Sequence, residues 1–421
     1  MIADSIKNLI WGFPTVLIIT AFGAYFTFKS RLYLPKNIFA AFKTVFSSFK
    51  KSKTNGISPF AAAATALGGT VGVGSIVGVG YGIAVGGAGS VFWMWVCSFF
   101  GMGLKYAEVR ISLKDRLRSG SENYGGAPYR LKKLGYGGMS AAFCLLCTLC
   151  SFGTGNVAQT GAVASFLRQA GVPPAAIAAV SGFAVALAVF GGRERISSLN
   201  AKILPAASAL YIAVCLAVLA ANAEGIPRAF GEIFSSAFGF APVAGGFSGA
   251  VISAAVKEGC ARSVFSNEAG MGSSPLAHAT SEGDPETQSA FGVFEIFFDS
   301  FAVSTLTAVC LLSCRTEDIS SAFSSVLGQI APAVFGALTA VFAFAAVISW
   351  CYYAECCLFC LFGSRKAVFI IYRLAFSACA AAGAFLPADG IIAVSDILNA
   401  GMMVPNMFLL YRCRSEINQT R

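Results

Sequence analysis

The feature that most constrains this chain is a glycine-rich segment inside an apolar stretch long enough to span a membrane. Six of the fourteen residues from Leu67 to Gly80 (LGGTVGVGSIVGVG) are glycine. A transmembrane helix satisfies its backbone hydrogen bonds internally, and glycine weakens helices, so this density favours a helix that breaks at mid-membrane. Such breaks occur where the freed backbone lines a cavity, as in transporters whose half-helices point at a substrate. Close helix packing through small residues is the alternative that this segment alone leaves open.

Apolar stretches long enough to cross a membrane recur from end to end of the chain. The sequence is 56% hydrophobic, with a mean hydropathy of +0.72. This composition predicts an all-α polytopic membrane protein without a soluble domain, and the first span should be retained as an anchor. We expect eleven spans, at residues 9–28, 59–86, 89–111, 140–167, 174–191, 202–221, 245–281 (interrupted), 288–312, 331–362, 367–386 and 391–411.

The distribution of basic residues predicts the orientation. Twenty-three of the 30 Lys and Arg fall in five loops of one membrane face, at residues 29–53, 105–133, 193–202, 363–366 and 412–421. By the positive-inside rule these loops are cytoplasmic, so the N-terminus should lie outside and the C-terminus inside the cell membrane. The net charge of +10 is therefore a topology signal, and it gives no support to nucleic-acid binding.

The cysteines and the single histidine are interpreted as structural. Two groups of cysteines recur at helical spacing inside apolar spans, and neither has a histidine nearby. We expect them to pack as small hydrophobic residues, without a metal site or disulfide. His278 falls near a cytoplasmic helix end and is predicted to be a solvated loop residue. The cysteine groups are Cys144, Cys147 and Cys150, and Cys356, Cys357 and Cys360.

A second interruption occurs in the seventh predicted span. Residues 259–275 (GCARSVFSNEAGMGSSP) combine polar residues and glycines with a terminating Pro275. The second and seventh spans are five apart, so they enter the membrane from opposite sides. This arrangement predicts an inverted repeat of five plus five helices, each repeat beginning with a discontinuous helix. The single transporter domain (1–421) would comprise an extra helix and basic linker (1–58), a first repeat (59–221) and a second repeat (245–411).

The expected site lies between the two breaks, near the middle of the membrane. Half-helix N-termini attract a carboxylate, whereas freed carbonyls and half-helix C-termini attract an ammonium group or a metal cation. A zwitterionic amino acid presents both charges, so it suits this geometry. Serine is plentiful, but with one histidine and no metal-binding HExxH motif the sequence gives only weak support to an intramembrane enzyme.

Six segments in this order give the chain a family resemblance: TALGGTVGVGSIVGVG, GSVFWMWVCSFFGMGLKYAEV, SFGTGNVAQ, ARSVFSNEAGMGSSPLAHAT, GVFEIFFDS and SWCYYAECCLFCLFG. They resemble the alanine/glycine:cation symporters, also called sodium:alanine symporters, over nearly the whole chain. The resemblance implies the leucine-transporter-type fold with one extra N-terminal helix. It also implies uptake of alanine, glycine or a similar amino acid, driven by sodium or protons.

The resemblance also implies roles for individual residues. Backbone amides near the first break would hold the substrate carboxylate, and the second break would supply carbonyls and an aromatic wall. The implied substrate-binding residues are Gly72, Gly74, Ser75, Gln159, Phe265, Asn267, Glu268, Gly270 and Trp350. Sodium would be coordinated by the carbonyls of Gly68 and Val71, with groups from the ninth span such as Ser349. No cofactor is expected besides the coupling ion, Na⁺ or H⁺. No protein partner is evident, and lipid and the amino acid are the expected ligands.

Two departures from the family pattern bear on the coupling ion. Ser75 stands where the family usually has asparagine, and Ala345 and Ala346 stand where it usually has adjacent hydroxyls. Hard cations require oxygen ligands, and alanine side chains offer none. A proton-coupled transporter and an uncoupled facilitator therefore remain as alternatives. Glu268 is interpreted as orienting the unwound backbone, with a proton carrier as its second possible role.

Charges within the spans are expected to pair. Arg262 is four residues after Glu258, which favours an ion pair on one helix face. Glu355 and Arg373 are candidate partners between neighbouring helices. Because charge inside a membrane is expensive, these side chains should face the protein interior.

Overall fold

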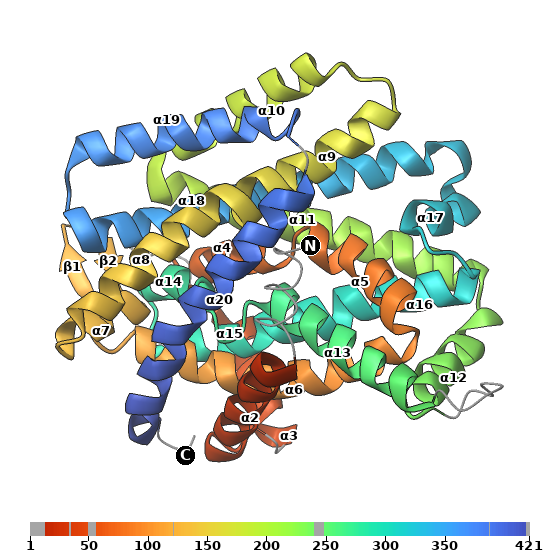
Figure 1. The fold of residues 1–421 in the computed structure, drawn as a ribbon, viewed down its shortest axis with the longest axis horizontal. Helices are drawn as coiled ribbons and strands as arrows, with labels where there is room; N and C mark the ends of the chain where they lie inside the picture. Colours follow the sequence, from red (N-terminus) through yellow and green to blue (C-terminus); the bar gives the residue numbers. More distant parts are fainter. Residues whose placement is uncertain are drawn as a thin grey trace.

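The computed structural model describes residues 13–32, 35–48, 56–120, 122–239, 248–386 and 388–417, and these residues are mostly helical. Residues 9–12 of the first predicted span, residues 33–34 and 49–55 of the basic linker and the last four residues lie outside these ranges. The long helices run across the molecule, with β1, β2 and α7 at one end and α12 and α17 at the other (Figure 1).

The elements of the first half coincide with the first six predicted spans and the loops between them. They are α2 (Phe13–Lys29), α3 (Pro35–Ser48), α4 (Pro59–Thr70), α5 (Val73–Gly86), α6 (Gly89–Ser112), β1 (Leu117–Ser119), β2 (Glu122–Tyr124), α7 (Ala127–Lys133), α8 (Gly137–Phe152), the π-helix η1 (Gly153–Val157), α9 (Ala158–Gln169), α10 (Pro174–Val189), α11 (Gly192–Ala221) and α12 (Gly225–Ala237).

The elements of the second half coincide with the last five predicted spans and with the loops between and after them. They are α13 (Ser248–Asn267), α14 (Ser274–Ala279), α15 (Pro285–Ile296), the π-helix η2 (Phe297–Ser304), α16 (Thr305–Cys314), α17 (Ile319–Leu327), the 3₁₀-helix η3 (Gly328–Ile330), α18 (Ala331–Phe362), α19 (Lys366–Ala382), α20 (Ala388–Arg412) and the 3₁₀-helix η4 (Arg414–Glu416). β1 and β2 form a two-stranded antiparallel sheet in which Leu117 faces Tyr124.

Five helical stretches of the described ranges are long and apolar enough to cross a membrane, and the α2 and α10 regions are shorter apolar helices. The five stretches are Pro59–Gly86, Gly137–Gln169, Gly192–Ala221, Pro285–Cys314 and Ile319–Phe362. α6 is also long, but its second half carries Lys105, Glu108 and Arg110, of which Lys105 and Glu108 are buried. The predicted all-helical, multi-pass architecture is confirmed.

Both predicted helix breaks are present. Ser58 caps the N-terminus of α4 by accepting a hydrogen bond from the Ala61 amide, and α4 then ends at Thr70, before α5 begins at Val73. The second break separates the end of α13 from the start of α14. Within it Glu268, Gly270 and Gly272 all have positive φ angles, of 49°, 88° and 76°. Glycine adopts this left-handed conformation without a steric cost, and for Glu268 the conformation is uncommon.

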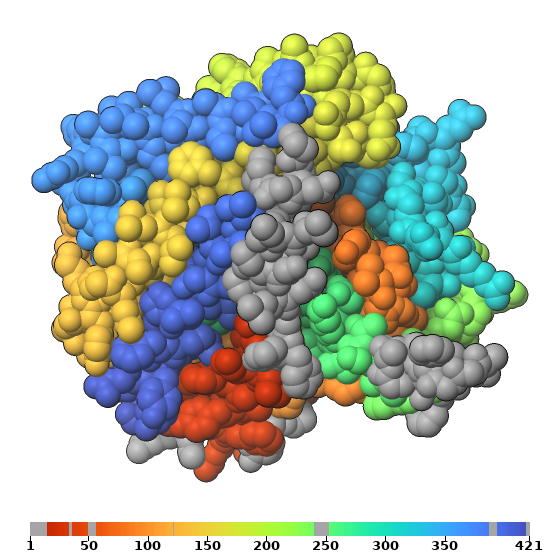
Figure 2. Space-filling model, in the orientation of Figure 1, coloured from red at the N-terminus to blue at the C-terminus, as the bar shows by residue number. Residues whose placement is uncertain are grey.

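α18 lies at the centre of the bundle, and its segment from Ala345 to Cys360 is buried throughout. It packs against α4, α8, α9 and α11, whereas α13 packs against α5 and α6. Figure 2 shows α5 and α13 next to each other on one face of the molecule, and α20 crosses the same face beside α8. The two broken spans therefore pack against helices from both halves of the chain.

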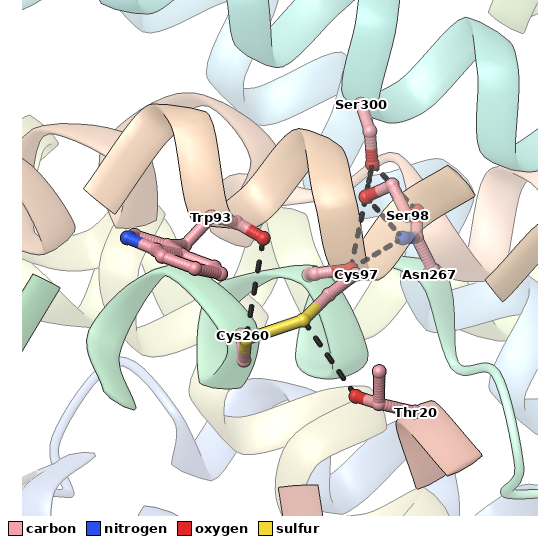
Figure 3. Close-up of a disulfide and its surroundings, with 8 residues drawn as sticks. Thr20, Trp93, Cys97, Ser98, Cys260, Asn267 and Ser300 are labelled. Atoms are coloured by element: carbon pink, nitrogen blue, oxygen red, sulfur yellow. Dashed lines mark hydrogen bonds between the residues drawn. A yellow bond between two sulfur atoms is a disulfide. The ribbon is translucent and has the colours of Figure 1, made fainter. Parts of the chain in front are cut away.

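The structure corrects the expectation that no cysteine forms a disulfide. Cys97 of α6 and Cys260 of α13 are bonded to each other, 163 residues apart in sequence (Figure 3). They belong to neither of the two helically spaced groups, whose members are buried free thiols as expected. Within the described ranges no group of three or more His, Cys, Asp or Glu side chains is placed to hold a metal ion.

The prediction for His278 is wrong. Its side chain is fully buried on α14, where Nδ1 is 2.6 Å from Gln288 Oε1 and Nε2 is 3.1 Å from Glu295 Oε2. The chain turns back into α15 directly after α14, so α15 covers the histidine. The predicted pairing of Arg373 with Glu355 is confirmed, because Arg373 Nε donates to Glu355 Oε1 at 2.5 Å.

Candidate functional site

A cavity of about 280 Å³ lies between the two helix breaks. The first break, α9, the second break, α18 and α20 all contribute to its wall. Six of the nine residues that the sequence predicts for substrate binding line it: Gly72, Gly74, Gln159, Phe265, Glu268 and Trp350. Residues almost 280 positions apart in sequence thus meet at one site.

The first break leaves backbone groups without their helical partners. In a continuous helix the Gly72 amide would bond to the Gly68 carbonyl, but it donates to the Thr70 carbonyl at 3.0 Å. The Ser75 amide donates to the Gly72 carbonyl at 3.3 Å, so the Val71 carbonyl also loses its helical donor. The break therefore makes carbonyl oxygens available for a ligand.

Gln159 fixes the conformation of this break. Its Oε1 accepts a hydrogen bond from the Val73 amide at 3.3 Å, and its Nε2 donates to the Thr154 carbonyl at 3.4 Å. The Val73 amide is the first of α5, so the glutamine acts as a cap supplied by another helix. Gly74, one residue further on, faces open space within the cavity wall.

The second break is held by two buried carboxylates. Ser273 Oγ donates to Glu268 Oε2 at 2.5 Å, which connects the two ends of the break. Glu108 of α6 accepts from the Gly272 amide at 3.1 Å, and Asn406 donates to the Gly270 carbonyl at 2.8 Å. Glu268 also lines the cavity, and its role in orienting the unwound backbone stays a prediction.

Aromatic side chains form part of the cavity wall. Trp350 is buried on α18 and stacks edge-to-face with Tyr353, with ring centroids 5.6 Å apart. Gly155 lets Trp350 take this position, since a Cβ at residue 155 would lie 2.4 Å from the tryptophan side chain. Phe265 lines the cavity from the end of α13.

Three predicted substrate residues lie beside the cavity and do not line it. The Ser75 hydroxyl contacts Ser266 Oγ at 2.9 Å, which links the two broken spans. Asn267 faces α6 and η2, where its amide contacts Ser98 and Ser300 (Figure 3). The Gly270 carbonyl is taken by Asn406.

Gly68 and Ser349, two of the three residues predicted to bind sodium, lie together. A Cβ built on Gly68 would be 2.7 Å from Ser349 Oγ and 3.4 Å from both the Ala345 carbonyl oxygen and the Asn200 side chain. Ser349 Oγ accepts a hydrogen bond from Asn200 Nδ2 at 2.9 Å. The α4 break, α11 and α18 therefore bring several neutral oxygens to one place.

Other polar residues that line the cavity were not predicted from the sequence, among them Thr154, Arg262, Asp396 and Asn399. The predicted ion pair of Arg262 with Glu258 is not what the structure has. The Arg262 guanidinium lies over the rings of Tyr81 and Phe265, at 5.2 and 5.7 Å. Arg262 could have been predicted to line the cavity, because it lies in the interrupted segment 259–275. Asp396 and Asn399 lie on α20, where no sequence pattern marks them.

A multi-span helical bundle with a cavity between two broken helices defines a secondary transporter. The solved structure of MhsT in complex with L-phenylalanine resembles this one, with a TM-score of 0.58 and 16% identity over 86% of this chain and 90% of that one. The similarity shows the leucine-transporter-type fold. The chain belongs to the sodium:alanine symporter family, whose model matches residues 1–419.

Named relatives support this assignment over almost the full length. The sodium/alanine symporter AgcS of Methanococcus maripaludis is 33% identical, over 96% of this chain and 93% of the relative. An uncharacterized transporter of Haemophilus influenzae is 32% identical over 99% of this chain and 94% of the relative. The probable sodium/glutamine symporter GlnT of Bacillus subtilis is 29% identical over 96% and 86%. The protein is thus a transporter of amino-acid symporter type and not an enzyme.

Proposed function

We propose that this protein imports a small neutral amino acid, alanine or glycine, in symport with sodium. The observation that carries the proposal is the cavity between the two breaks, which combines freed backbone groups with an aromatic wall. Membership of the sodium:alanine symporter family supports the same reaction. Because one relative is named for alanine and another for glutamine, the substrate must be argued from this cavity.

The two ends of a zwitterion would face the two breaks. The carboxylate is placed at the start of α5, against the backbone of Gly72 and Gly74, where the helix dipole favours negative charge. The ammonium group is placed at the end of α13, where helix-end carbonyls and the Glu268 carboxylate favour positive charge. Gln159 holds the α5 end in position, and Phe265 and Trp350 would enclose the side chain.

The residues around Gly68 fit a sodium ion. The carbonyls of Gly68 and Val71 have lost their helical donors, and Ser349 Oγ lies against Gly68. All three are neutral oxygens, which suit a hard monovalent cation. Bound there, sodium would supply positive charge that holds the α4 break against α18, so ion binding would stabilise the form of the break that receives the substrate.

The proposed orientation follows from the basic loops. β1, β2 and α7 would face the cytoplasm, and α12 and α17 the outside, which matches their separation at opposite ends of the bundle (Figure 1). The repeats 59–221 and 245–411 would be related by a two-fold axis in the membrane plane. The C-terminus would then be cytoplasmic and the N-terminus outside.

Competition for labelled alanine tests the proposed substrate. Alanine and glycine should compete in proteoliposomes, and leucine and phenylalanine should compete poorly. Each methylene added to a closed, well-packed pocket costs about 1–3 kcal/mol. A control series of alanine, 2-aminobutyrate and norvaline adds one methylene at a time, so affinity should fall stepwise. Binding of leucine as tight as that of alanine would contradict the proposal.

Imposed ion gradients test the coupling. An inward sodium gradient should drive accumulation of alanine above its equilibrium level, and an equal potassium gradient should not. Accumulation driven by a proton gradient alone would show that the coupling ion is a proton and not sodium. Glu268→Gln would then be the first variant to examine. Equilibration without accumulation under either gradient would identify a facilitator.

A further inference from the structure

Asn200 of α11 has a buried oxygen without a partner in the structure. The side chain is fully buried, and its Nδ2 donates to Ser349 Oγ at 2.9 Å. Its Oδ1 is also buried and accepts no hydrogen bond. A buried amide oxygen that has lost its water without gaining a donor is costly, so such a group calls for an explanation.

The surroundings of Asn200 are rich in oxygen acceptors. Its carboxamide carbon lies 3.4 Å from the position of a Cβ on Gly68, and that same position is 3.4 Å from the Ala345 carbonyl. The Gly68 carbonyl has lost its helical donor. With the Ser349 hydroxyl, these neutral oxygens form a set of ligands of the kind that a hard cation binds.

We propose that Asn200 Oδ1 is a direct ligand of the coupling sodium ion. The inference rests on the proposed function, because it assigns a further ligand to the ion placed at Gly68, Val71 and Ser349. Asn200 supplies from α11 a side-chain oxygen of the kind that Ala345 and Ala346 do not supply from α18. A neutral amide is suited to a monovalent ion, whereas divalent ions favour carboxylates.

The hydrogen bond to Ser349 gives Asn200 a second role, which is to orient the Ser349 hydroxyl toward the ion. By donating from Nδ2 it occupies one lone pair of Ser349 Oγ and leaves the other for the ion. The same bond fixes the rotation of the carboxamide, so that Oδ1 is the atom left to bind the ion. One residue of α11 thus acts as a ligand and orients another on α18.

Equilibrium binding of ²²Na⁺ to the purified full-length protein, without amino acid, tests the inference. Asn200→Leu keeps the branched shape and the number of non-hydrogen side-chain atoms but lacks the oxygen, so its sodium affinity should fall about tenfold or more. Asn200→Asp keeps an oxygen in place, so it should bind sodium at least as tightly as the unmodified protein. Its binding should also weaken at acid pH, because the new carboxyl must be deprotonated to bind the ion.

Asn156→Leu is the matched control. Asn156 is also fully buried, its Nδ2 donates to the Phe376 carbonyl at 2.8 Å, and its Oδ1 also has no hydrogen-bond partner. Asn156 lies on η1 and its hydrogen bond is to α19, whereas the proposed sodium ligands lie on the α4 break, α11 and α18. Its replacement should therefore leave the sodium affinity unchanged. The control therefore separates loss of an ion ligand from general damage to a buried amide.

The outcomes distinguish the inference from the proposed function. If the unmodified protein binds sodium and Asn200→Leu binds it equally well, Asn200 is not a ligand and the proposed coupling stands. If the unmodified protein binds no sodium, the proposed coupling and the inference both fail. If Asn200→Leu does not fold, Asn200→Asp decides, and sodium binding by that variant without any pH dependence would overturn the inference.

Discussion

Replacing Lys105 with methionine is expected to destabilise the protein by about 3–5 kcal/mol, the usual cost of removing one partner of a buried ion pair. Lys105 of α6 is fully buried, and its Nζ lies 2.6 Å from Ser274 Oγ and 3.4 Å from Glu295 Oε1. Glu295 also contacts His278, so removing the lysine leaves a buried carboxylate without its cation. Thermal unfolding in detergent, with the fraction folded followed by size-exclusion chromatography, measures the loss.

Two further variants make this result specific. Lys114→Met removes a lysine of the surface ion pair with Glu416, so it should cost less than about 1 kcal/mol. Lys105→Met combined with Glu295→Gln removes both charges and should recover much of the lost stability. If the double variant is no more stable than Lys105→Met, the lysine acts through packing and not through its charge.

Replacing Gly69 with alanine is expected to reduce alanine uptake about tenfold or more. A Cβ at residue 69 would lie 2.3 Å from Tyr353 Oη, which donates to the carbonyls of Thr65 and Ala66 at 3.3 and 3.1 Å. Tyr353 would have to withdraw from the last turns of α4, and such overpacking costs about 1–3 kcal/mol. Initial rates of uptake, normalised to the amount of folded protein, measure the effect.

Gly74→Ala is the control for this prediction. Gly74 belongs to the same glycine-rich segment, but a Cβ there meets nothing within 4 Å. The variant should fold normally, and any loss of uptake should come from a higher KM, because the new methyl group occupies the cavity. Equal loss of folded protein in both variants would contradict the assignment of the close contact to Gly69 alone.

The sequence predicted the fold well because the membrane restricts the choices. In a chain of apolar helical spans a continuous helix satisfies the backbone in lipid, so interruptions stand out. The predicted interruptions, in Leu67–Gly80 and in residues 259–275, contain the observed breaks. The positions of six cavity residues followed from the family resemblance.

The remaining features depend on contacts that a single sequence does not display. Asn200 follows Leu199 near the start of a long helix, with no local pattern to mark it, and its importance appears only when α11 meets α4 and α18. His278 stands next to a predicted loop, yet α15 folds over it. Cys97 and Cys260 lie in two apolar spans without a pattern that marks them as a pair, and the pairing becomes evident only where α6 and α13 lie side by side.

The bond between these two cysteines has a mechanical consequence. It ties α6, the span that follows the first broken one, to α13, the helix before the second break, so the two helices cannot separate at these residues during a transport cycle. We expect α6 and α13 to move together as one rigid body. Access to the cavity from either side then has to change elsewhere, for example where α5 and α20 contact this pair. A distance probe placed across the pair itself should record a constant distance throughout the cycle.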